Sequence, residues 1–249
     1  MRIGRDIMLR ASGIVLLAAI WQIAGPLYQS PALPTFGRVL GTLYYFIRDG
    51  TLNRHIAASL NIVLRGIGIA ALIGFALGLL MFRYPSIRAA ALPVIESIRG
   101  VAALTLFPLL IVLFGLSTFS RAFVIFWTAW PAILLSTVNS LNIDENVVDA
   151  ARTSGAGEWR IIFRIRIPIA SQGLITGLRI GVGGGWIGLI AAEMLGATQG
   201  LGYFLLWSAQ SFRFERVYAT IIVIAAIGGG MNWILLFAQR QAAKFLGVT

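Results

Sequence analysis

The ionisable side chains that could do chemistry are few, and several catalytic sets are missing. The 249 residues contain no cysteine and one histidine, His55. Disulfides, cysteine-bound zinc and thiol catalysis are therefore excluded. A lone histidine, most simply an interfacial or helix-end residue, argues against a histidine metal site and a Ser-His-Asp triad. The only lysine, Lys244, stands between Ala243 and Phe245, so there is no G-x-x-x-x-G-K-[ST] phosphate loop. Any ATP must be used by another chain, and we expect no cofactor or metal on this one.

The densest group of polar residues runs from Asp144 to Trp159. Asp144 is a good N-cap for a helix whose first turn is acidic, and Gly155 can adopt the left-handed conformation that ends a helix. Between them, Ala150-Ala151 would give this helix a small, close-packing surface. A docking site for a partner and an ordinary interfacial loop are equally compatible with this pattern.

A second short helix follows in the same segment. Residues Glu158–Ile167 fit a helix that Pro168 would end, because proline cannot donate the backbone hydrogen bond that continues a helix. The segment 141–172 is therefore predicted to fold as two short helices joined by a glycine turn, lying across one face of the molecule.

Glycine recurs at every fourth residue after this segment, at Gly173, Gly177, Gly181 and Gly185. On a helix these glycines form one stripe, which allows a second helix to approach closely. Packing within the chain, a close contact with a second copy and the wall of a narrow path all fit this stripe. The run 183–185 is all glycine and is a candidate hinge, since each glycine costs a helix about 1 kcal/mol relative to alanine.

The elements that must hold these residues are apolar helices. The chain is 58% hydrophobic and 12% charged, with a mean hydropathy of +0.86, whereas a soluble domain is about a quarter charged. This composition argues against a soluble globule and against a disordered chain. Six continuous runs approach the roughly 20 apolar residues that a membrane-spanning helix needs, and they lack the alternation of barrel strands. These runs are Ala11–Tyr28, Leu60–Phe82, Ala91–Leu116, Arg121–Asn139, Gly173–Leu195 and Val217–Ala238.

We therefore predict an all-α polytopic membrane protein in which residues 1–249 form a single transmembrane domain. The first run follows three arginines, as a signal peptide would. It is longer than a usual signal and ends without a small-residue cleavage site, so a retained helix is expected. The connections 29–59 and 196–216 are amphipathic or rich in aromatic residues, and we expect both at the outer membrane interface. The first of them contains an amphipathic stretch at Phe36–Ile47.

The net charge of +11 comes from nineteen arginines and one lysine. They are spread between the apolar runs rather than gathered on one polar face, so we expect no nucleic-acid partner. With both termini inside, eleven basic residues lie on the cytoplasmic side and seven outside, which favours an N-in, C-in topology. The inner set is Arg2, Arg5, Arg10, Arg83, Arg88, Arg152, Arg160, Arg164, Arg166, Arg240 and Lys244, and the outer set is Arg38, Arg48, Arg54, Arg65, Arg121, Arg213 and Arg216.

Four further charges lie within the apolar runs, where ionisable side chains are rare and often functional. Glu96 and Arg99 are three residues apart, so on a helix they share a face and can pair. Arg179, among several glycines, could attract an anion or pair with a carboxylate or a helix-end carbonyl. Glu193 stands at the outer end of its run, where helix packing is the alternative. For all four, a role in a translocation path or gate and a structural role remain open.

The loop pattern resembles that of a known family. Asp149-Ala150-Ala151, three further residues, Gly155 and then Ile167-Pro168 resemble the E-A-A-x-x-x-G loop of binding-protein-dependent ABC importer permeases. Aspartate replaces the usual glutamate and keeps its charge. Other segments, over roughly residues 30–240, resemble the nitrate/sulfonate/taurine/bicarbonate branch of these permeases. They include Leu33-Pro34-Thr35, Ala58-Ser59-Leu60, Val63-Leu64-Arg65-Gly66, Phe114-Gly115-Leu116, Gly177-Leu178-Arg179, Ala191–Gly196 and Gly200–Tyr203.

One segment departs from the branch. The usual third span opens with a proline-rich R-P-x-P-x-x-A-x-x-P-L sequence. Here Arg99 and Pro108 remain, and the first two prolines are replaced by Gly100 and Ala102. If this segment lines the path, the shape of the path and its solute are expected to differ from those of the usual member.

The resemblance implies a type I ABC importer permease fold with a cytoplasmic coupling helix. The residues implied in coupling to the ATPase are Asp149, Ala150, Ala151, Arg152, Gly155, Trp159 and Pro168. The implied partners are two ATPase subunits that carry ATP and magnesium, a second permease copy in a homodimer, membrane lipid, and a periplasmic or lipid-anchored solute-binding protein. The implied location is the bacterial inner membrane.

The solute that the branch implies is a small oxyanion or an organic sulfonate. An ABC permease for a neutral or cationic solute, such as a pyrimidine-type vitamin precursor, is the alternative within the class. A secondary transporter is the alternative outside it, although the sequence shows no internal repeat of the kind such transporters carry. A membrane enzyme would need a clustered catalytic set, whereas most of the acids lie in the 141–172 loop.

Overall fold

The described chain is a bundle of helices. The computed structural model describes residues 2–28, 30–142 and 145–245, and no strand occurs among them, so the all-α prediction is confirmed. The elements are α1 (Arg2–Tyr28), α2 (Phe36–Arg48), α3 (Thr51–Arg83), α4 (Pro85–Arg99), the 3₁₀ turn η1 (Ala103–Leu106), α5 (Phe107–Phe114), α6 (Thr118–Leu141), α7 (Glu145–Thr153), α8 (Glu158–Ile161), the π turn η2 (Ile162–Arg166), α9 (Ile167–Gly196), α10 (Leu201–Gln210) and α11 (Phe214–Phe245).

Four of the described helices, α3, α6, α9 and α11, are long and apolar enough to cross a membrane. A fifth span results if α4 and the bent segment after it are counted together. α1 is a further helix of 27 residues. The multi-pass character is therefore confirmed, whereas the count of six spans and the N-in, C-in topology stay predictions.

The third predicted span is not one helix. α4 ends at Arg99, and the next helical segment, Ala103–Phe114, is bent from it by 80°. Ala102 is extended, with φ −61° and ψ 126°, and a 3₁₀ turn precedes α5. The predicted run Ala91–Leu116 is therefore two helical segments rather than one continuous helix, and its crossing of the membrane as one span stays a prediction. Hydropathy shows which residues are apolar, but one extended residue, Ala102, is enough to change the direction of the chain.

The helix that corresponds to the second predicted span begins earlier in the sequence than predicted. α3 starts at Thr51 rather than Leu60, so Arg54, assigned to the connection 29–59, lies inside the helix. Arg65, counted with the outer basic residues, lies inside it as well. A polar first turn carries no hydropathy signal, which explains the shift. The amphipathic stretch before it is confirmed as α2, which buries Val39 on one face.

α6 lies at the centre of the packed bundle, between α3 and α9. On the α3 side, Gly66, Gly74 and Gly78 face α6, and a Cβ at Gly74 would come within 2.7 Å of the Trp130 carbonyl oxygen. Such contacts leave no room for a side chain. The absence of a Cβ therefore lets the two backbones approach each other closely.

The predicted glycine stripe lies on the other side of α6. Gly173, Gly177, Gly181 and Gly185 of α9 all face α6, and a Cβ at Gly181 would lie 2.7 Å from the Ala129 Cβ. This places the stripe in an interface within the chain. α9 runs without a break through the three consecutive glycines of the candidate hinge.

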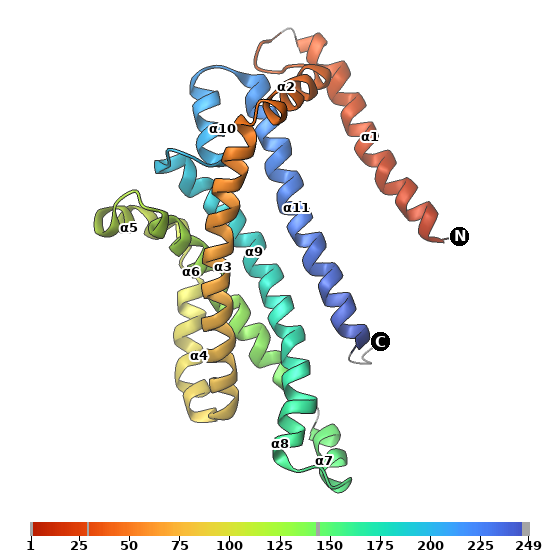
Figure 1. Ribbon diagram of the computed structural model, residues 1–249, viewed down its shortest axis with the longest axis vertical. Helices are drawn as coiled ribbons and strands as arrows, with labels where there is room; N and C mark the ends of the chain where they lie inside the picture. The colour runs from red at the N-terminus through yellow and green to blue at the C-terminus, as the bar shows by residue number, and fades with distance from the viewer. Residues whose placement is uncertain (1, 29, 143–144, 246–249) are drawn as a thin grey trace.

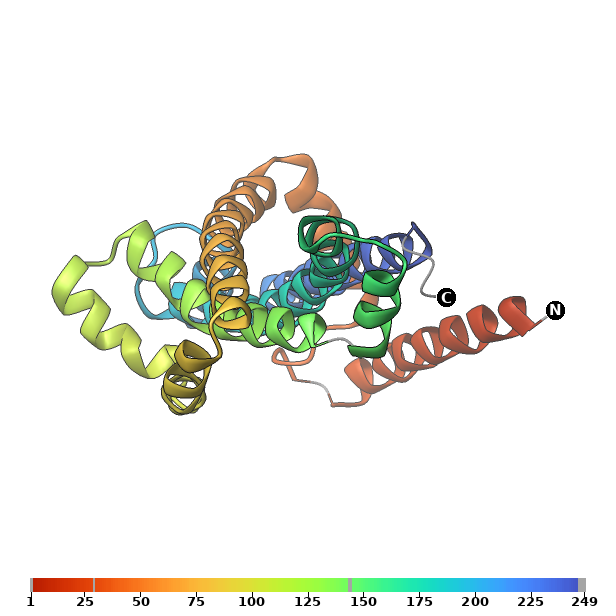
Figure 2. The same cartoon turned by 90° about the horizontal axis from the view of Figure 1, so that it is seen from below.

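The molecule has two distinct ends (Figure 1). α10 lies at one, termed the α10 end, and α7 and α8 lie at the other, termed the α7–α8 end. α1 leaves the bundle near the α10 end and extends to one side, as the view from below also shows (Figure 2). Trp21 connects α1 to the rest of the chain. Its Nε1 donates to the Pro34 carbonyl at 3.1 Å, and its ring contacts Phe36 and Tyr218.

Candidate functional site

α7 is the first element of the α7–α8 end. It spans Glu145–Thr153, near the predicted helix, while the predicted N-cap Asp144 lies outside the described residues. Gly155 follows with a φ of +80°, a left-handed conformation that residues with a Cβ rarely adopt. The local sequence thus fixes where α7 stops.

Two hydrogen bonds complete the end of α7. The Ala156 amide donates to the Ala151 carbonyl at 3.0 Å, and the Gly155 amide donates to the Arg152 carbonyl at 2.9 Å. These are the two bonds of a Schellman cap, which satisfies carbonyls that the last helical turn leaves unpaired. Gly155 therefore ends α7 as predicted.

α7 has a buried face and an open face. Val148 is 3% exposed, whereas Asp149 and Ala150 are exposed. Arg152 Nη1 lies 3.3 Å from Asp149 Oδ1, and half or more of each side chain is accessible. Trp159 is 75% exposed, a large fraction for an aromatic side chain. Most of the residues predicted to couple the chain to a partner are therefore exposed, whereas Ala151 and Pro168 are partly buried.

The second short helix does not end at Pro168. α8 passes through the π turn Ile162–Arg166 directly into α9, and Pro168 lies in the first turn of α9. There its missing N–H leaves no helical hydrogen bond unmade. The predictions that Pro168 stops a helix and that the loop extends to Gln172 are wrong. As a result, α8 runs into the long α9 without an intervening loop, and α7 joins α8 through the short turn at residues 154–157.

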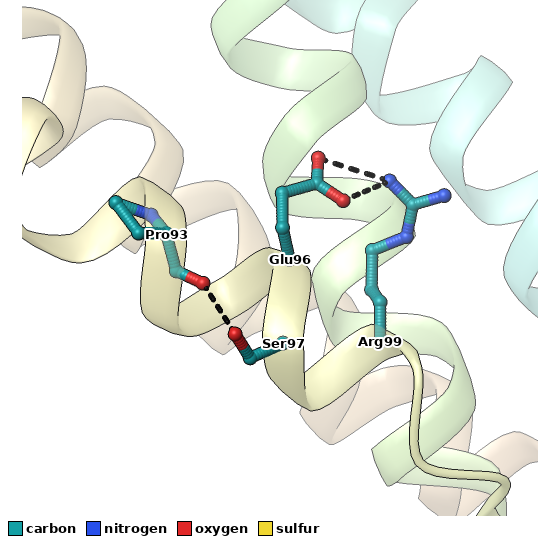
Figure 3. A network of polar contacts seen from close by, with 4 residues as sticks. All are labelled: Pro93, Glu96, Ser97 and Arg99. Atoms are coloured by element: carbon teal, nitrogen blue, oxygen red, sulfur yellow. Dashed lines mark hydrogen bonds and ion pairs between the residues drawn. The ribbon is translucent and has the colours of Figure 1, made fainter.

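Glu96 and Arg99 pair on the last turn of α4 (Figure 3). Arg99 Nη1 donates to the two Glu96 carboxylate oxygens at 3.2 and 3.1 Å. The two side chains remain 51% and 49% exposed, with Arg99 given first. On the same turn, Ser97 Oγ donates to the Pro93 carbonyl at 2.9 Å. The helical spacing thus produces the expected pair, and it lies on an open face.

Arg179 contacts an amide side chain. Its Nη1 donates to Gln239 Oε1 at 3.2 Å, and Gln239 Nε2 donates to Thr176 Oγ1 at 3.0 Å. The described residues give Arg179 no carboxylate within ion-pair distance. The three side chains form a polar link between α9 and α11, so the structure places Arg179 in a contact between helices.

Glu193 is the centre of a buried polar network at the α10 end. Its side chain is 1% exposed. Ser59 Oγ of α3 lies 2.8 and 2.9 Å from the two carboxyl oxygens, and the Gly202 amide donates to one of them at 2.9 Å. Glu193 therefore joins α3, α9 and α10, which is a packing role at the end of its span.

The same network caps the first turn of α10 with side chains from other helices. The Leu201 amide donates to Ser59 Oγ at 2.9 Å, and the Gly200 amide donates to His55 Nδ1 at 3.2 Å. Helix N-termini leave amides unpaired, and here α3 and α9 supply the acceptors. Gly200 has a φ of +124°, and a Cβ on it would collide with the Glu193 carboxyl group. Only glycine fits this turn.

The sequence analysis missed three residues. Ser59 and His55 are four residues apart on one apolar helix, a spacing that could have indicated a shared polar face. Arg65 was counted with the outer basic residues although the predicted run Leu60–Phe82 contains it, and it lies 14 residues into α3 and is exposed.

Comparison with known proteins agrees with this arrangement. Residues 66–244 match the family described as "Binding-protein-dependent transport system inner membrane component". The chain is 29% identical over 255 residues to the taurine transport system permease protein TauC of Escherichia coli, covering 98% of this chain and 92% of that protein. It is 30% identical over 241 residues to the nitrate import permease protein NrtB of Synechocystis, covering 92% and 86%. It is also 30% identical over 250 residues to the bicarbonate transport system permease protein CmpB of Synechococcus elongatus, covering 94% and 88%.

The fold is also found in a solved transporter. A chain of the MetNI methionine ABC transporter in inward-facing conformations superposes with a TM-score of 0.61, at 17% sequence identity, covering 78% of this chain and 95% of that chain. At this identity the likeness shows the fold alone.

These findings confirm the resemblance drawn from the 141–172 loop. The protein is a multi-pass component of the bacterial inner membrane, it is not itself an enzyme, and it works with ATPase subunits and a solute-binding protein. The chain belongs to the family of binding-protein-dependent transport system inner membrane components, the permease subunits of ABC importers.

Proposed function

We propose that this permease carries a small oxyanion or an organic sulfonate. Relatives named for taurine, nitrate and bicarbonate support this solute class. Arg65 and Arg99 add two exposed cations within apolar helical segments. A path lined by positive charge raises the local concentration of anions over that of neutral or cationic solutes.

The assembly in this proposal contains two copies of the chain around one path. Two ATPase subunits bind at the α7–α8 end, and the solute-binding protein, periplasmic or lipid-anchored, delivers solute at the other. ATP and magnesium bind on the ATPase subunits, because this chain has one lysine and no phosphate-binding loop around it.

The observation that carries the coupling part is the connection between α7 and α9. α7 has an exposed outer face, Gly155 fixes its end, and α8 passes through the π turn into a 30-residue helix. ATP binding closes the ATPase pair and draws the two α7 helices together. Because the turn between α7 and α8 is short and closed by the Gly155 cap, and α8 is continuous with α9, the displacement reaches α9 and changes the side to which the path opens.

Replacing Gly155 by valine tests this proposal. Valine cannot adopt a φ of +80° without strain, so α7 will lose its cap and ATP-driven uptake of taurine and nitrate is expected to fall at least about tenfold, the effect of roughly 1.4 kcal/mol of lost coupling. Uptake is measured in proteoliposomes that contain the complete transporter, and membrane insertion is checked by the yield of this chain.

Gly157→Val is the matched control. Gly157 lies two residues away, has no positive φ, and a Cβ there would meet nothing within 4 Å. This variant is expected to retain most of the uptake. Normal uptake by Gly155→Val, or equal loss in both variants, refutes the assigned coupling role.

A further inference from the structure

A groove of about 360 Å³ runs along α6 beside the bend between α4 and η1. Its size is at the lower end of the range for small-molecule sites, about 300–1,000 Å³. Arg99, Val101 and Ala102 form the wall at the bend, and Thr128, Ser136 and Asn139 are the polar residues on the α6 wall. The groove therefore combines one cation with several uncharged polar groups.

α4 is long enough to reach into a membrane. It packs beside α3 through Met81 and Ile95, and it rises about 21 Å between Pro85 and Arg99, against a hydrocarbon core about 30 Å thick. Glu96 and Arg99 are about half exposed in the single chain. Half-exposed charges facing lipid are strongly unfavourable, so a face that lines an aqueous space is the favourable place for this pair.

The wall at the bend is fixed in place. Trp127 Nε1 of α6 donates to the Val101 carbonyl at 3.2 Å, and Thr105 Oγ1 donates to the Ala102 carbonyl at 2.7 Å. The first bond holds the residues between α4 and η1 against α6, and the second fixes the local turn from Ala102 into η1. A groove that is shaped before a ligand arrives loses less ordering free energy on binding.

We infer that this groove is an anion subsite on the path, in which Arg99 recognises a sulfonate or oxyanion and Glu96 is its internal counter-ion. The inference rests on the proposed function. Arg99 contacts Glu96 through Nη1 alone, so Nε and Nη2 are the donors that a planar guanidinium offers to an oxyanion in a two-point contact.

Glu96 sets how strongly the subsite binds an anion. With Glu96 in place the empty pair is neutral, and an arriving anion binds Nε and Nη2 of a guanidinium whose charge the carboxylate at Nη1 already compensates. The carboxylate stays on the same helix turn when the anion leaves. A conduction site must bind its solute strongly enough to admit it and weakly enough to release it, and an internal counter-ion lowers the affinity of Arg99 for this purpose.

The absence of cysteine from this chain allows a direct test. Ala102→Cys places a thiol in the groove wall, and Ser86→Cys places one in the first turn of α4 as a matched control, both at exposed positions. Each variant is reacted, in the complete transporter, with anionic sulfonatoethyl methanethiosulfonate or cationic trimethylammonioethyl methanethiosulfonate. The mass of this chain reports the rate, and the ratio of the anionic to the cationic rate reports the local potential.

Arg99→Gln is expected to lower this ratio at position 102 about tenfold and Glu96→Gln to raise it about tenfold, the effect of one unit charge a few ångströms away in a partly aqueous site. Neither change should alter the ratio at position 86. Added taurine or nitrate should slow the anionic reagent at position 102 only. A purely structural pair would change the ratio in the same opposite directions, because each substitution removes one charge whatever its role. Protection of position 102 by taurine or nitrate, and its loss in Arg99→Gln, therefore distinguishes an anion subsite from a structural pair.

An unchanged ratio in both variants overturns the inference, and so does a ratio that changes as expected without protection by either anion. ATP-driven uptake by the unlabelled Ala102→Cys transporter is measured in parallel. If anions are taken up but the labelling ratio at position 102 does not change, the subsite is refuted and the proposed function stands. If the labelling ratio changes as expected but no anion is taken up, the proposed function is refuted.

Discussion

Polar side chains are buried at one end of this permease and exposed at the other. At the α10 end, Glu193 is buried and bonded to Ser59 and Gly202. At the α7–α8 end, Asp149 and Trp159 are exposed. The first end is completed by contacts within the chain, and the second presents its polar and aromatic groups outward.

The difference follows from what surrounds each end. A buried polar group needs a partner within the protein, because an unpaired one costs free energy. α3, α9 and α10 therefore meet around one buried carboxyl group. An exposed segment has no such requirement, so it can keep a surface available for another chain. Stability is thus concentrated at the α10 end and coupling at the α7–α8 end, and substitutions at the two ends should separate these properties.

Glu193→Ala should have the largest effect on stability. It leaves the Ser59 hydroxyl and the Gly202 amide buried without this acceptor, and each such group costs about 1–3 kcal/mol. We expect the free energy of unfolding to fall by roughly 2–5 kcal/mol, measured by denaturation of the purified chain in detergent. Glu193→Gln keeps an acceptor oxygen and should lose only about 1 kcal/mol.

Glu96→Ala is the control for this measurement. Its carboxylate is half exposed and paired on the surface of α4, and surface pairs contribute about 0–1 kcal/mol. If Glu193→Ala is no more destabilising than Glu96→Ala, the α10 end is not the stabilising end of the molecule.

The glycine stripe between the two ends should give an intermediate effect. Gly177 packs directly against the backbone of Ile133, whereas a Cβ at Gly183 would meet nothing within 4 Å. Gly177→Ala should therefore cost about 1–3 kcal/mol through overpacking. Gly183→Ala should stabilise α9 by up to about 1 kcal/mol, because alanine favours a helix. The same denaturation experiment measures the change in the free energy of unfolding for both variants. Changes of the same sign would contradict the assigned packing of α9 on α6.

The sequence analysis succeeded where a feature depends on neighbours along the chain. Gly155 ends α7 because one residue must adopt a positive φ, and glycine is the residue that does so readily. The pairing of Glu96 with Arg99 likewise follows from helical spacing alone. Both are local, so residue type and position were sufficient.

It failed where distant segments or subtle backbone changes decide the outcome. The Glu193 network joins residues 134 positions apart, from Ser59 to Glu193, and no local pattern contains it. The bend at Ala102 and the π turn before Pro168 occur in chain that reads as helical. Composition correctly predicts that each of these segments is helical, but it does not show where the backbone departs from a regular helix.

The smallest stability effect should come from the coupling surface. Ala150 lies on the exposed face of α7, and glutamate is nearly as good a helix former as alanine, so Ala150→Glu should change the free energy of unfolding by less than about 0.5 kcal/mol. It should nevertheless abolish uptake, because a long charged side chain occupies a surface suited to close packing. Ala150→Ser keeps the residue small and should preserve both properties. Copurification of the ATPase with each variant separates loss of docking from loss of folding. An Ala150→Glu chain that still binds the ATPase and transports would show that α7 contacts its partner through another face.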